Sequence, residues 1–218
     1  MCGRFEGTNE TWAQLYELLS EFAQLPEETA ARYAEREMRP TNNYPIITKA
    51  AAGGYEVIEA RWWLVPTMHR GPLKDWKYTT FNAKIEEAAT KASFRGPWKS
   101  KHCLVPVRSF WEWKTDNPEA PKSKQTKTRY CITRGDNHPM VLAGLWEHAK
   151  LSDGEVTSFT VLTRANGADM EGLHTREPVL LDPDQWKPWL DCAAMPELQA
   201  PTRAGLFRPA LEGRAAYA

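Results

Sequence analysis

The chain has 218 residues, 42% of them hydrophobic and 26% charged, and its 28 Lys and Arg balance its 28 Asp and Glu. This composition is typical of a globular protein of one large or two small domains and excludes a disordered chain. No apolar run approaches the roughly 20 residues of a membrane-spanning helix, and the sequence does not start with a basic segment followed by an apolar one, so we expect a cytoplasmic protein.

Two helices are predicted at the start of the chain. The first spans residues 9–22, where apolar side chains recur on one helical stripe. The second begins at Pro26, because proline favours the first position of a helix. A helix is also predicted over residues 82–92 with Asn82 as its N-terminal cap, and a last one begins at Asp182.

Strand patterns dominate the rest of the chain. Strands are predicted at residues 46–49, 55–63, 102–107, 110–114, 129–133, 140–147 and 157–163, with a hairpin turn at Gly53-Gly54 and a hairpin tip at 116–127. Strands without regular helical crossovers indicate an α+β fold, a curled antiparallel β-structure or barrel flanked by helices. We expect one domain over residues 1–200 and a loosely held C-terminal tail over 201–218.

The four cysteines give no sign of a disulfide framework or a metal site. Cys2, Cys103, Cys131 and Cys192 are far apart and form no CxxC pair. His102 and Cys103 are neighbours on a predicted strand, so their side chains point to opposite faces and make a poor metal pair. We therefore expect neither a metal nor a cofactor.

Charge is unevenly distributed along the chain. Residues 61–134 contain 16 Lys and Arg against 6 Asp and Glu, together with six of the ten tryptophans. Cations bind phosphates and flat aromatic faces stack on unpaired bases, so this segment suits single-stranded nucleic acid. A solvated basic face beside an ordinary aromatic core explains the composition equally well.

Cys2 directly follows the first methionine in MCGRFEG. Removal of that methionine leaves an α-amine beside the thiol, and such an aminothiol reacts with an aldehyde to give an imine and then a thiazolidine ring. An α-amine with a pKa near roughly 7.7–8.0 is partly neutral at cytoplasmic pH, whereas a lysine near roughly 10.4 is not. A cysteine at position 2 is by itself usually incidental, so this reading needs partner residues.

Three further residues are candidates for such partners, each with a plain structural alternative. Glu112 lies in the aromatic stretch FWEWK, where apolar surroundings raise a carboxyl pKa, or where it simply faces water at a sheet edge. His174 lies between a predicted short helix and an apolar strand, and is either catalytic or bonded to a loop carbonyl. Asn82 is either a site residue or only a helix cap.

Taken together, the motifs resemble those of the SRAP (SOS response-associated peptidase) family. The stretches are MCGRF, FNAKIEEA, HCLVPVRSFWEWK, AGLW, FTVLT and LHTREPVLL, in the family's order and spacing from Met1 to about Asp191. The resemblance implies a single SRAP-type domain with a positively charged channel for single-stranded DNA. It also implies capture of the ring-opened aldehyde of an abasic site as a thiazolidine DNA–protein crosslink, and self-processing that here removes only Met1.

The resemblance also implies roles for individual residues. The catalytic set is Cys2 as nucleophile and amine donor, Asn82 to orient the amine and the opened sugar, Glu112 as general acid and base, and His174 to assist proton transfer and, in some members, crosslink reversal. DNA contacts fall to Arg4, Trp63, His69, Lys84 and Arg176. The implied partner is single-stranded DNA containing abasic sites, bound by a monomer in the cytoplasm near the nucleoid, with no membrane and no metal.

Three positions depart from the family pattern. Lys84 stands where the family usually has arginine, so a two-point phosphate contact becomes a single one. Glu177 follows Arg176 where methionine or arginine is usual, and an acid beside the DNA channel is expected to weaken binding. Thr67-Met68-His69 stand where aromatic residues are often found, so stacking there either falls to His69 or is absent.

Two other functions remain open from the sequence. In an N-terminal-nucleophile amidohydrolase, Cys2 attacks an amide and its own amine acts as the base, which leaves Glu112, His174 and the basic segment without a purpose. In a non-catalytic single-strand binder, the channel acts without chemistry, and the changes at positions 84 and 177 keep that reading open.

Overall fold

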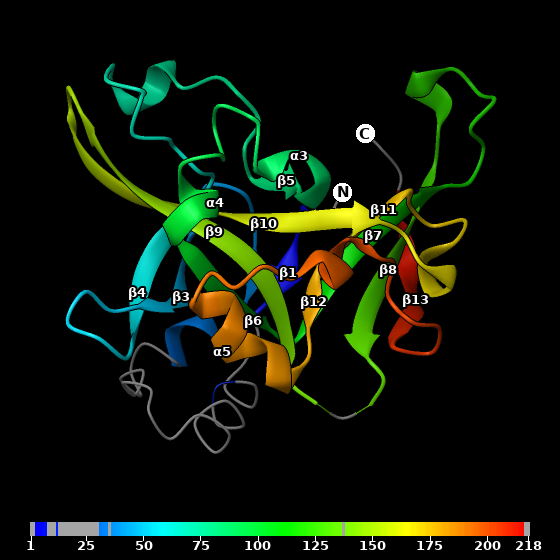
Figure 1. The fold of residues 1–218 in the computed structure, drawn as a ribbon. Coiled ribbons are helices and arrows are strands. Elements are labelled where there is room, and N and C mark those ends of the chain that lie inside the picture. Colours follow the sequence, from blue (N-terminus) through cyan, green and yellow to red (C-terminus); the bar gives the residue numbers. More distant parts are fainter. Residues whose placement is uncertain (1–2, 8–11, 13–30, 35, 137, 216–218) are drawn as a thin grey trace.

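A closed ring of five strands forms the centre of the molecule (Figure 1). The computed structural model describes residues 3–7, 12, 31–34, 36–136 and 138–215. The ring consists of β3 (Asn43–Lys49), β4 (Tyr55–Trp62), β6 (His102–Val107), β9 (Met140–Leu151) and β10 (Gly154–Ala165). Antiparallel pairing joins β4 to β3, β3 to β6, β6 to β9 and β9 to β10, and parallel pairing of β10 with β4 closes the ring. The predicted α+β fold around a barrel-like β-structure is confirmed.

Each predicted strand is present, most of them extended by a few residues. The hairpin between β3 and β4 turns at Gly53 and Gly54, whose φ values of +91° and +75° are in the left-handed region that glycine adopts without a Cβ penalty. Three short strands extend the barrel: β5 (Asn82–Lys84) and β11 (Arg176–Pro178) pair with β10, and β12 (Leu180–Leu181) pairs with β9.

A second sheet contains strands from both the N-terminal and the C-terminal part of the chain. Its order is β13 (Phe207–Ala215), β8 (Lys127–Arg134), β7 (Ser109–Thr115), β1 (Phe5–Glu6) and β2 (Glu37–Met38). The loop between β7 and β8 is the predicted hairpin tip. The loosely held tail expected after residue 200 is wrong for residues 207–215, because β13 pairs with β8 along its length and Phe207 is buried. The division of the chain at residue 200 itself stays a prediction.

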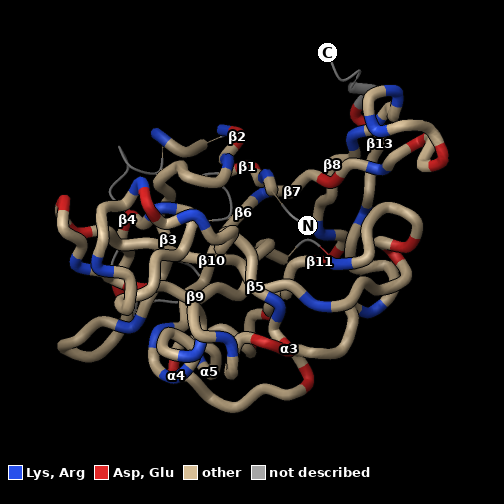
Figure 2. The backbone as a smooth tube through the Cα atoms, turned by 90° about the horizontal axis from the view of Figure 1, so that it is seen from above, with Lys and Arg blue, Asp and Glu red and all other residues tan. Residues whose placement is uncertain are grey.

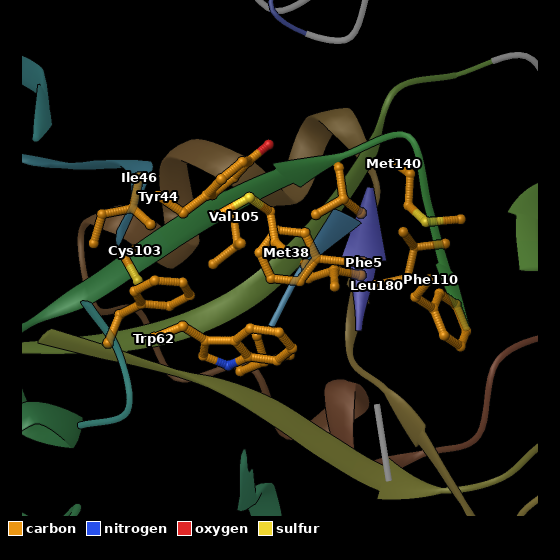
Figure 3. Packing of buried hydrophobic residues seen from close by; sticks show 14 of the residues in the cluster. Phe5, Met38, Tyr44, Ile46, Trp62, Cys103, Val105, Phe110, Met140 and Leu180 are labelled. Atoms are coloured by element: carbon orange, nitrogen blue, oxygen red, sulfur yellow. The ribbon is translucent and has the colours of Figure 1, made fainter. Parts of the chain in front are cut away.

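Alternating side chains on the barrel strands build two hydrophobic cores. One face of the strands packs under the helices, and we call it the helix-side core; it includes Ile47, Leu104, Val141, Leu162 and Trp189. The other face continues onto the second sheet, and we call it the inner core; it includes Phe5, Trp62, Val105, Phe110, Phe159 and Val161. Figure 3 shows Phe5 of β1 among the inner-core side chains of Met38, Val105 and Trp62. This two-residue alternation is what strand geometry requires.

After residue 36, the described part of the chain contains the α-helices α3 (Ile85–Ala88), α4 (Pro97–Ser100) and α5 (Trp186–Leu190), the last preceded by a 3-10 turn whose capping residue is Asp182. Helix α3 is shorter than the helix predicted there. The helix predicted over 82–92 is wrong at its start, because Asn82 lies in strand β5 and Lys84 occupies the capping position of α3. The predicted helix over 9–22 and the start of the one at Pro26 fall largely outside the described residues. Within the described part, no helix is long and apolar enough to span a membrane.

Candidate active site at the rim of the inner core

Glu112 is a buried carboxylate on β7. It is 3% exposed and stands opposite Tyr130 of β8. Strand alternation puts it on the same face as Phe110, an inner-core residue, whereas Trp111 and Trp113 point to the opposite face. Burial raises the pKa of the Glu112 carboxyl, because the charged form loses hydration. The carboxyl therefore keeps its proton to a higher pH than an exposed glutamate does, and the edge-strand alternative is wrong.

The start of the chain lies against the strand that carries Glu112. Phe5 pairs with Phe110, and the Trp111 backbone N–H donates to the Arg4 carbonyl at 3.0 Å. Continuing this antiparallel register by one residue sets Gly3 opposite Glu112. Cys2 lies outside the described residues.

Asn82 faces the inner core from the other sheet. It stands opposite Val161 in the parallel pair of β5 with β10, and Val161 belongs to the inner core. The next residue, Ala83, packs into the helix-side core, which fixes Asn82 on the opposite face. Phe81, just before it, accepts a hydrogen bond at its carbonyl from Trp62 Nε1 at 2.8 Å and packs against the inner core.

His174 reaches the same core from a loop. It follows the 3-10 turn Ala168–Met170, and its backbone N–H donates to the carbonyl of Met170, an inner-core residue, at 3.3 Å. Its ring Nδ1 accepts from the Arg176 backbone N–H at 3.0 Å, so a neutral ring carries its proton on Nε2. Burial lowers the pKa of the imidazole, and the charge of Arg176 lowers it further. His174 is therefore neutral near pH 7, with Nδ1 as an acceptor for the backbone and Nε2–H as a donor.

Each of these three candidate residues lies against the inner core, and we call them the rim residues. A carboxyl with a raised pKa and a neutral imidazole are groups that acid and base catalysis uses, and an amide can orient a substrate. Asn82, Glu112 and His174 come from separate parts of the chain, and β1 lies beside β7, the strand that carries Glu112.

The three cations expected to hold DNA phosphates form ion pairs with acids. Arg4 pairs with Glu37, and Lys84 Nζ lies 2.8 Å from a Glu87 oxygen. Arg176 makes a two-point contact with Glu86 at 2.9 and 2.8 Å. Figure 2 shows acidic segments, coloured red, at α3, and both red and blue segments near β2. A phosphate that binds these cations has to displace the carboxylates or share the cations with them.

Glu37 is the centre of a larger charge cluster that the sequence did not indicate. Besides Arg4, it accepts from Arg39 Nε at 3.0 Å and from Arg129 at 2.8 Å. Burial opposes its charge, but the hydrogen bonds from these arginines dominate and lower the pKa of the carboxyl. The Arg129 guanidinium also lies 4.4 Å from the ring centre of Trp111, on the outer face of β7.

Glu177 is buried and does not face a DNA channel. The expectation that it weakens DNA binding assumed an exposed side chain, and that assumption is wrong. The residue is 1% exposed, and its side chain forms an ion pair with Arg164 at 3.1 Å. It also accepts from the backbone N–H groups of Gly167 at 2.8 Å and Thr202 at 2.7 Å. Strand β11 alternates, so Arg176 points outward where Glu177 points inward.

The two residues expected to stack on bases, Trp63 and His69, follow β4 in the chain. Trp63 Nε1 donates to the Tyr78 carbonyl at 2.9 Å, and the Trp63 ring is 5.3 Å from that of Phe81. His69 packs 5.3 Å from the ring of Trp76. Sequence reasoning missed Trp76 as well as Arg61 and Lys74, which line a hollow with Trp63. Their only sequence signal was the basic, tryptophan-rich composition of residues 61–134.

Comparisons with known proteins agree on one family. The sequence model of the SOS response associated peptidase (SRAP) family matches residues 1–213. The abasic site processing protein YoqW of Bacillus subtilis (strain 168) is 30% identical over 194 residues, which is 88% of this chain and 80% of that protein. The abasic site processing protein YMR114C of Saccharomyces cerevisiae is 32% identical over 133 residues, 60% of this chain, and that match spans only 34% of the yeast protein.

Solved structures show the same fold. A protein from Bacteroides thetaiotaomicron superposes with a TM-score of 0.78 at 21% identity, covering 96% of this chain and 91% of the other. A protein from Bordetella bronchiseptica gives a TM-score of 0.74 at 21% identity, covering 97% and 99%. At this identity the likeness concerns the fold alone.

Proposed function

The chain belongs to the SOS response associated peptidase (SRAP) family, and from that premise we propose that it captures abasic sites in single-stranded DNA as a covalent crosslink through Cys2. Its matched relatives carry the name abasic site processing protein. The reactive form has Cys2 as its first residue, after removal of Met1 by self-processing. It acts as a monomer in the cytoplasm near the nucleoid, without a metal or other cofactor.

One observation carries the proposal: the N-terminal segment runs along β7 beside Glu112. The hydrogen bond from the Trp111 N–H to the Arg4 carbonyl fixes this segment, and Gly3 stands opposite Glu112 in the extended register. Cys2 is joined to Gly3 by a single peptide bond. A nucleophile that starts the chain therefore needs little further chain length to act beside a buried acid.

The chemistry joins one aldehyde to one aminothiol and releases one water. The Cys2 amine adds to C1′ of the ring-opened deoxyribose and gives a carbinolamine. Glu112 donates its proton to the carbinolamine hydroxyl, which leaves as water, and the Glu112 carboxylate takes back the proton of the iminium nitrogen, so that an imine remains. The Cys2 thiol sulfur then bonds to C1′, the thiol proton passes to the imine nitrogen, and the thiazolidine ring closes. No oxidant or reductant takes part.

The other two rim residues and the cations complete the proposal. Asn82 orients the amine and the opened sugar through its amide. Neutral His174 assists the transfer of the amine proton to the carbinolamine oxygen as a hydrogen-bond donor through its Nε2–H, and it assists again when a crosslink reverses. Arg176 and Lys84 bind the phosphates that flank the lesion. To do so they release Glu86 and Glu87, the carboxylates that pair with them in the free protein.

A denaturing gel tests the proposed function. Purified protein is mixed with single-stranded oligonucleotides that contain or lack one abasic site. We expect a heat-stable shifted band that requires the lesion, disappears in Cys2→Ala and persists in the matched control Cys131→Ala. Retardation only on native gels and independent of the lesion indicates a non-catalytic binder, and turnover of small amides without DNA binding indicates an amidohydrolase. Intact mass reports whether Met1 has been removed, and a protein that keeps Met1 yet crosslinks contradicts the proposed chemistry.

A further inference from the structure

A hollow of about 460 Å³ lies beside β4, away from the three rim residues. It is lined by Thr41, Arg61, Trp63, Leu73, Lys74, Trp76 and Asp153. Its volume is within the range of roughly 300–1,000 Å³ that is typical of pockets for small ligands. This is room for one nucleotide and too little for a duplex.

Two indole rings form its aromatic walls, and the protein itself holds their polar edges. Trp63 Nε1 donates to the Tyr78 carbonyl at 2.9 Å, and Trp76 Nε1 donates to Thr80 Oγ1 at 3.1 Å. Thr80 is buried, and its hydroxyl donates a hydrogen bond to the Leu64 carbonyl at 2.6 Å. Hydrogen bonds therefore fix both rings at their edges, and because both indoles line the hollow, an unpaired base that enters it has aromatic side chains on which to stack.

The cations of the hollow differ from those at the rim. Among the described residues, neither Arg61 nor Lys74 forms an ion pair with a carboxylate, whereas Arg4, Lys84 and Arg176 each do. One Arg61 terminal nitrogen donates to the Thr41 carbonyl at 2.9 Å. The Arg61 Nε–H is buried, and no hydrogen-bond partner for it exists within the described part of the chain.

One acidic residue, Asp153, also lines the hollow, and it holds the backbone of Leu73, another lining residue. Both carboxylate oxygens of Asp153 accept from the Leu73 backbone N–H, each at 3.1 Å. A further hydrogen bond, from the Ser152 N–H to the Arg70 carbonyl at 3.1 Å, ties the same loop to the turn between β9 and β10. In Figure 1 this loop, coloured cyan, lies beside the tip of that hairpin. Two cations against one acid leave the hollow with a positive balance.

The hollow is joined to the rim by aromatic contact. The Trp63 ring is 5.3 Å from the Phe81 ring, and Phe81 immediately precedes Asn82 in the chain. A strand with its damaged sugar at Asn82 can therefore continue across Phe81 and Trp63 into the hollow.

We propose that this hollow binds one unpaired nucleotide of the strand that flanks the abasic site, with its base stacked on Trp76 or Trp63 and its phosphate held by Lys74 and Arg61. The inference rests on the proposed function for the position of the lesion, and it adds a second, non-covalent contact point to the DNA. The contact raises affinity for longer strands and leaves the covalent chemistry unchanged.

Binding measured against strand length tests this inference. Fluorescence anisotropy in a Cys2→Ala background, which isolates non-covalent binding, uses abasic oligonucleotides whose flanks are lengthened one nucleotide at a time on either side. The variants are Trp76→Ala, Lys74→Ala and the matched control Lys99→Ala, an exposed lysine that lines a different hollow. Lys74 is also exposed, so its variant keeps the test valid even where Trp76→Ala lowers stability.

We expect one flank length beyond which Trp76→Ala weakens binding roughly 5- to 150-fold, the usual loss for one stacked base. Lys74→Ala is expected to reduce the slope of log K against log salt by about 0.7, one phosphate on a single strand. Lys99→Ala is expected to change neither quantity. Equal affinities for all variants at every length overturn the inference, even when the Cys2-containing protein crosslinks normally. Absence of any crosslink overturns the proposed function instead, whatever the dependence on flank length.

Discussion

Replacement of Glu177 by alanine is expected to destabilise the protein strongly, although the residue lies beside a predicted DNA contact. Four donors converge on this carboxylate: Arg164 Nε at 3.1 Å, the Gly167 N–H at 2.8 Å, the Thr202 N–H at 2.7 Å and the Thr202 hydroxyl. The alanine variant leaves the buried guanidinium without a counter-charge and the two backbone groups without an acceptor.

The size of the effect follows from the burial of the pair. The side chains of Arg164 and Glu177 are 7% and 0% exposed, so solvent does not replace the lost partner. Removal of one member of such a buried pair costs about 3–5 kcal/mol. With an m-value of roughly 2–3 kcal/mol per M urea, the unfolding midpoint falls by about 1–2.5 M.

Urea unfolding followed by circular dichroism measures this midpoint. The matched control is Glu155→Ala, because Glu155 also pairs with a cation, Lys150, but its side chain is 55% exposed. An exposed pair of this kind is worth less than about 1 kcal/mol. A Glu177→Ala midpoint no lower than that of Glu155→Ala refutes the reasoning.

A second measurement distinguishes a buried Glu177 from a Glu177 that faces DNA, as the sequence suggested. If Glu177 faced bound DNA, Glu177→Gln would tighten single-strand binding and steepen its salt dependence. The buried position predicts no such gain in affinity. Simultaneous replacement of Arg164 and Glu177 by leucine is expected to recover part of the lost stability, because no unpaired charge remains buried.

Three further predictions follow from single contacts. Glu112→Gln is expected to slow crosslinking roughly 10²- to 10⁴-fold without weakening DNA binding, as measured on timed denaturing gels. The wild-type rate is expected to be bell-shaped in pH, since it rises as the amine loses its proton and falls as pH passes the raised pKa of Glu112; an unchanged profile in Glu112→Gln contradicts the role. Glu86→Gln frees Arg176 and is expected to tighten single-strand binding and to steepen the salt slope by about 0.7, and a flat response places Arg176 away from DNA. Phe207→Ala removes a buried ring 5.4 Å from that of Phe110 and is expected to cost about 3–5 kcal/mol in urea unfolding, whereas a loosely held tail predicts no loss.

The sequence by itself determined the strands, because apolar and polar residues alternate locally wherever one sheet face is buried. It also indicated Cys2, Glu112 and His174 as chemical groups, since their residue types and short motifs carry that information. The hairpin at Gly53-Gly54 was equally readable, because its conformation depends on those two residues alone.

Local pattern failed where a distant strand decides the outcome. Asn82 opens a segment with helical composition, but parallel pairing with β10 takes up its backbone and turns a helix cap into a strand residue that faces the inner core. The segment after residue 200 has no strong strand pattern, and β8 supplies the ladder that orders residues 207–215. Both results depend on hydrogen bonds to residues far along the chain.

Only the tertiary structure decided which charges are free to meet a ligand. The sequence shows Glu177 as the acid next to Arg176 and does not indicate Glu86, yet Glu177 is part of a buried network and it is Glu86 that pairs with the Arg176 guanidinium. The sequence likewise offers no reason to prefer Lys74 over Lys84 as a phosphate contact. Among the described residues, Lys84 is paired with an acid and Lys74 is not. Burial and ion pairing are set by how strands from distant segments pack, and no local pattern contains that information.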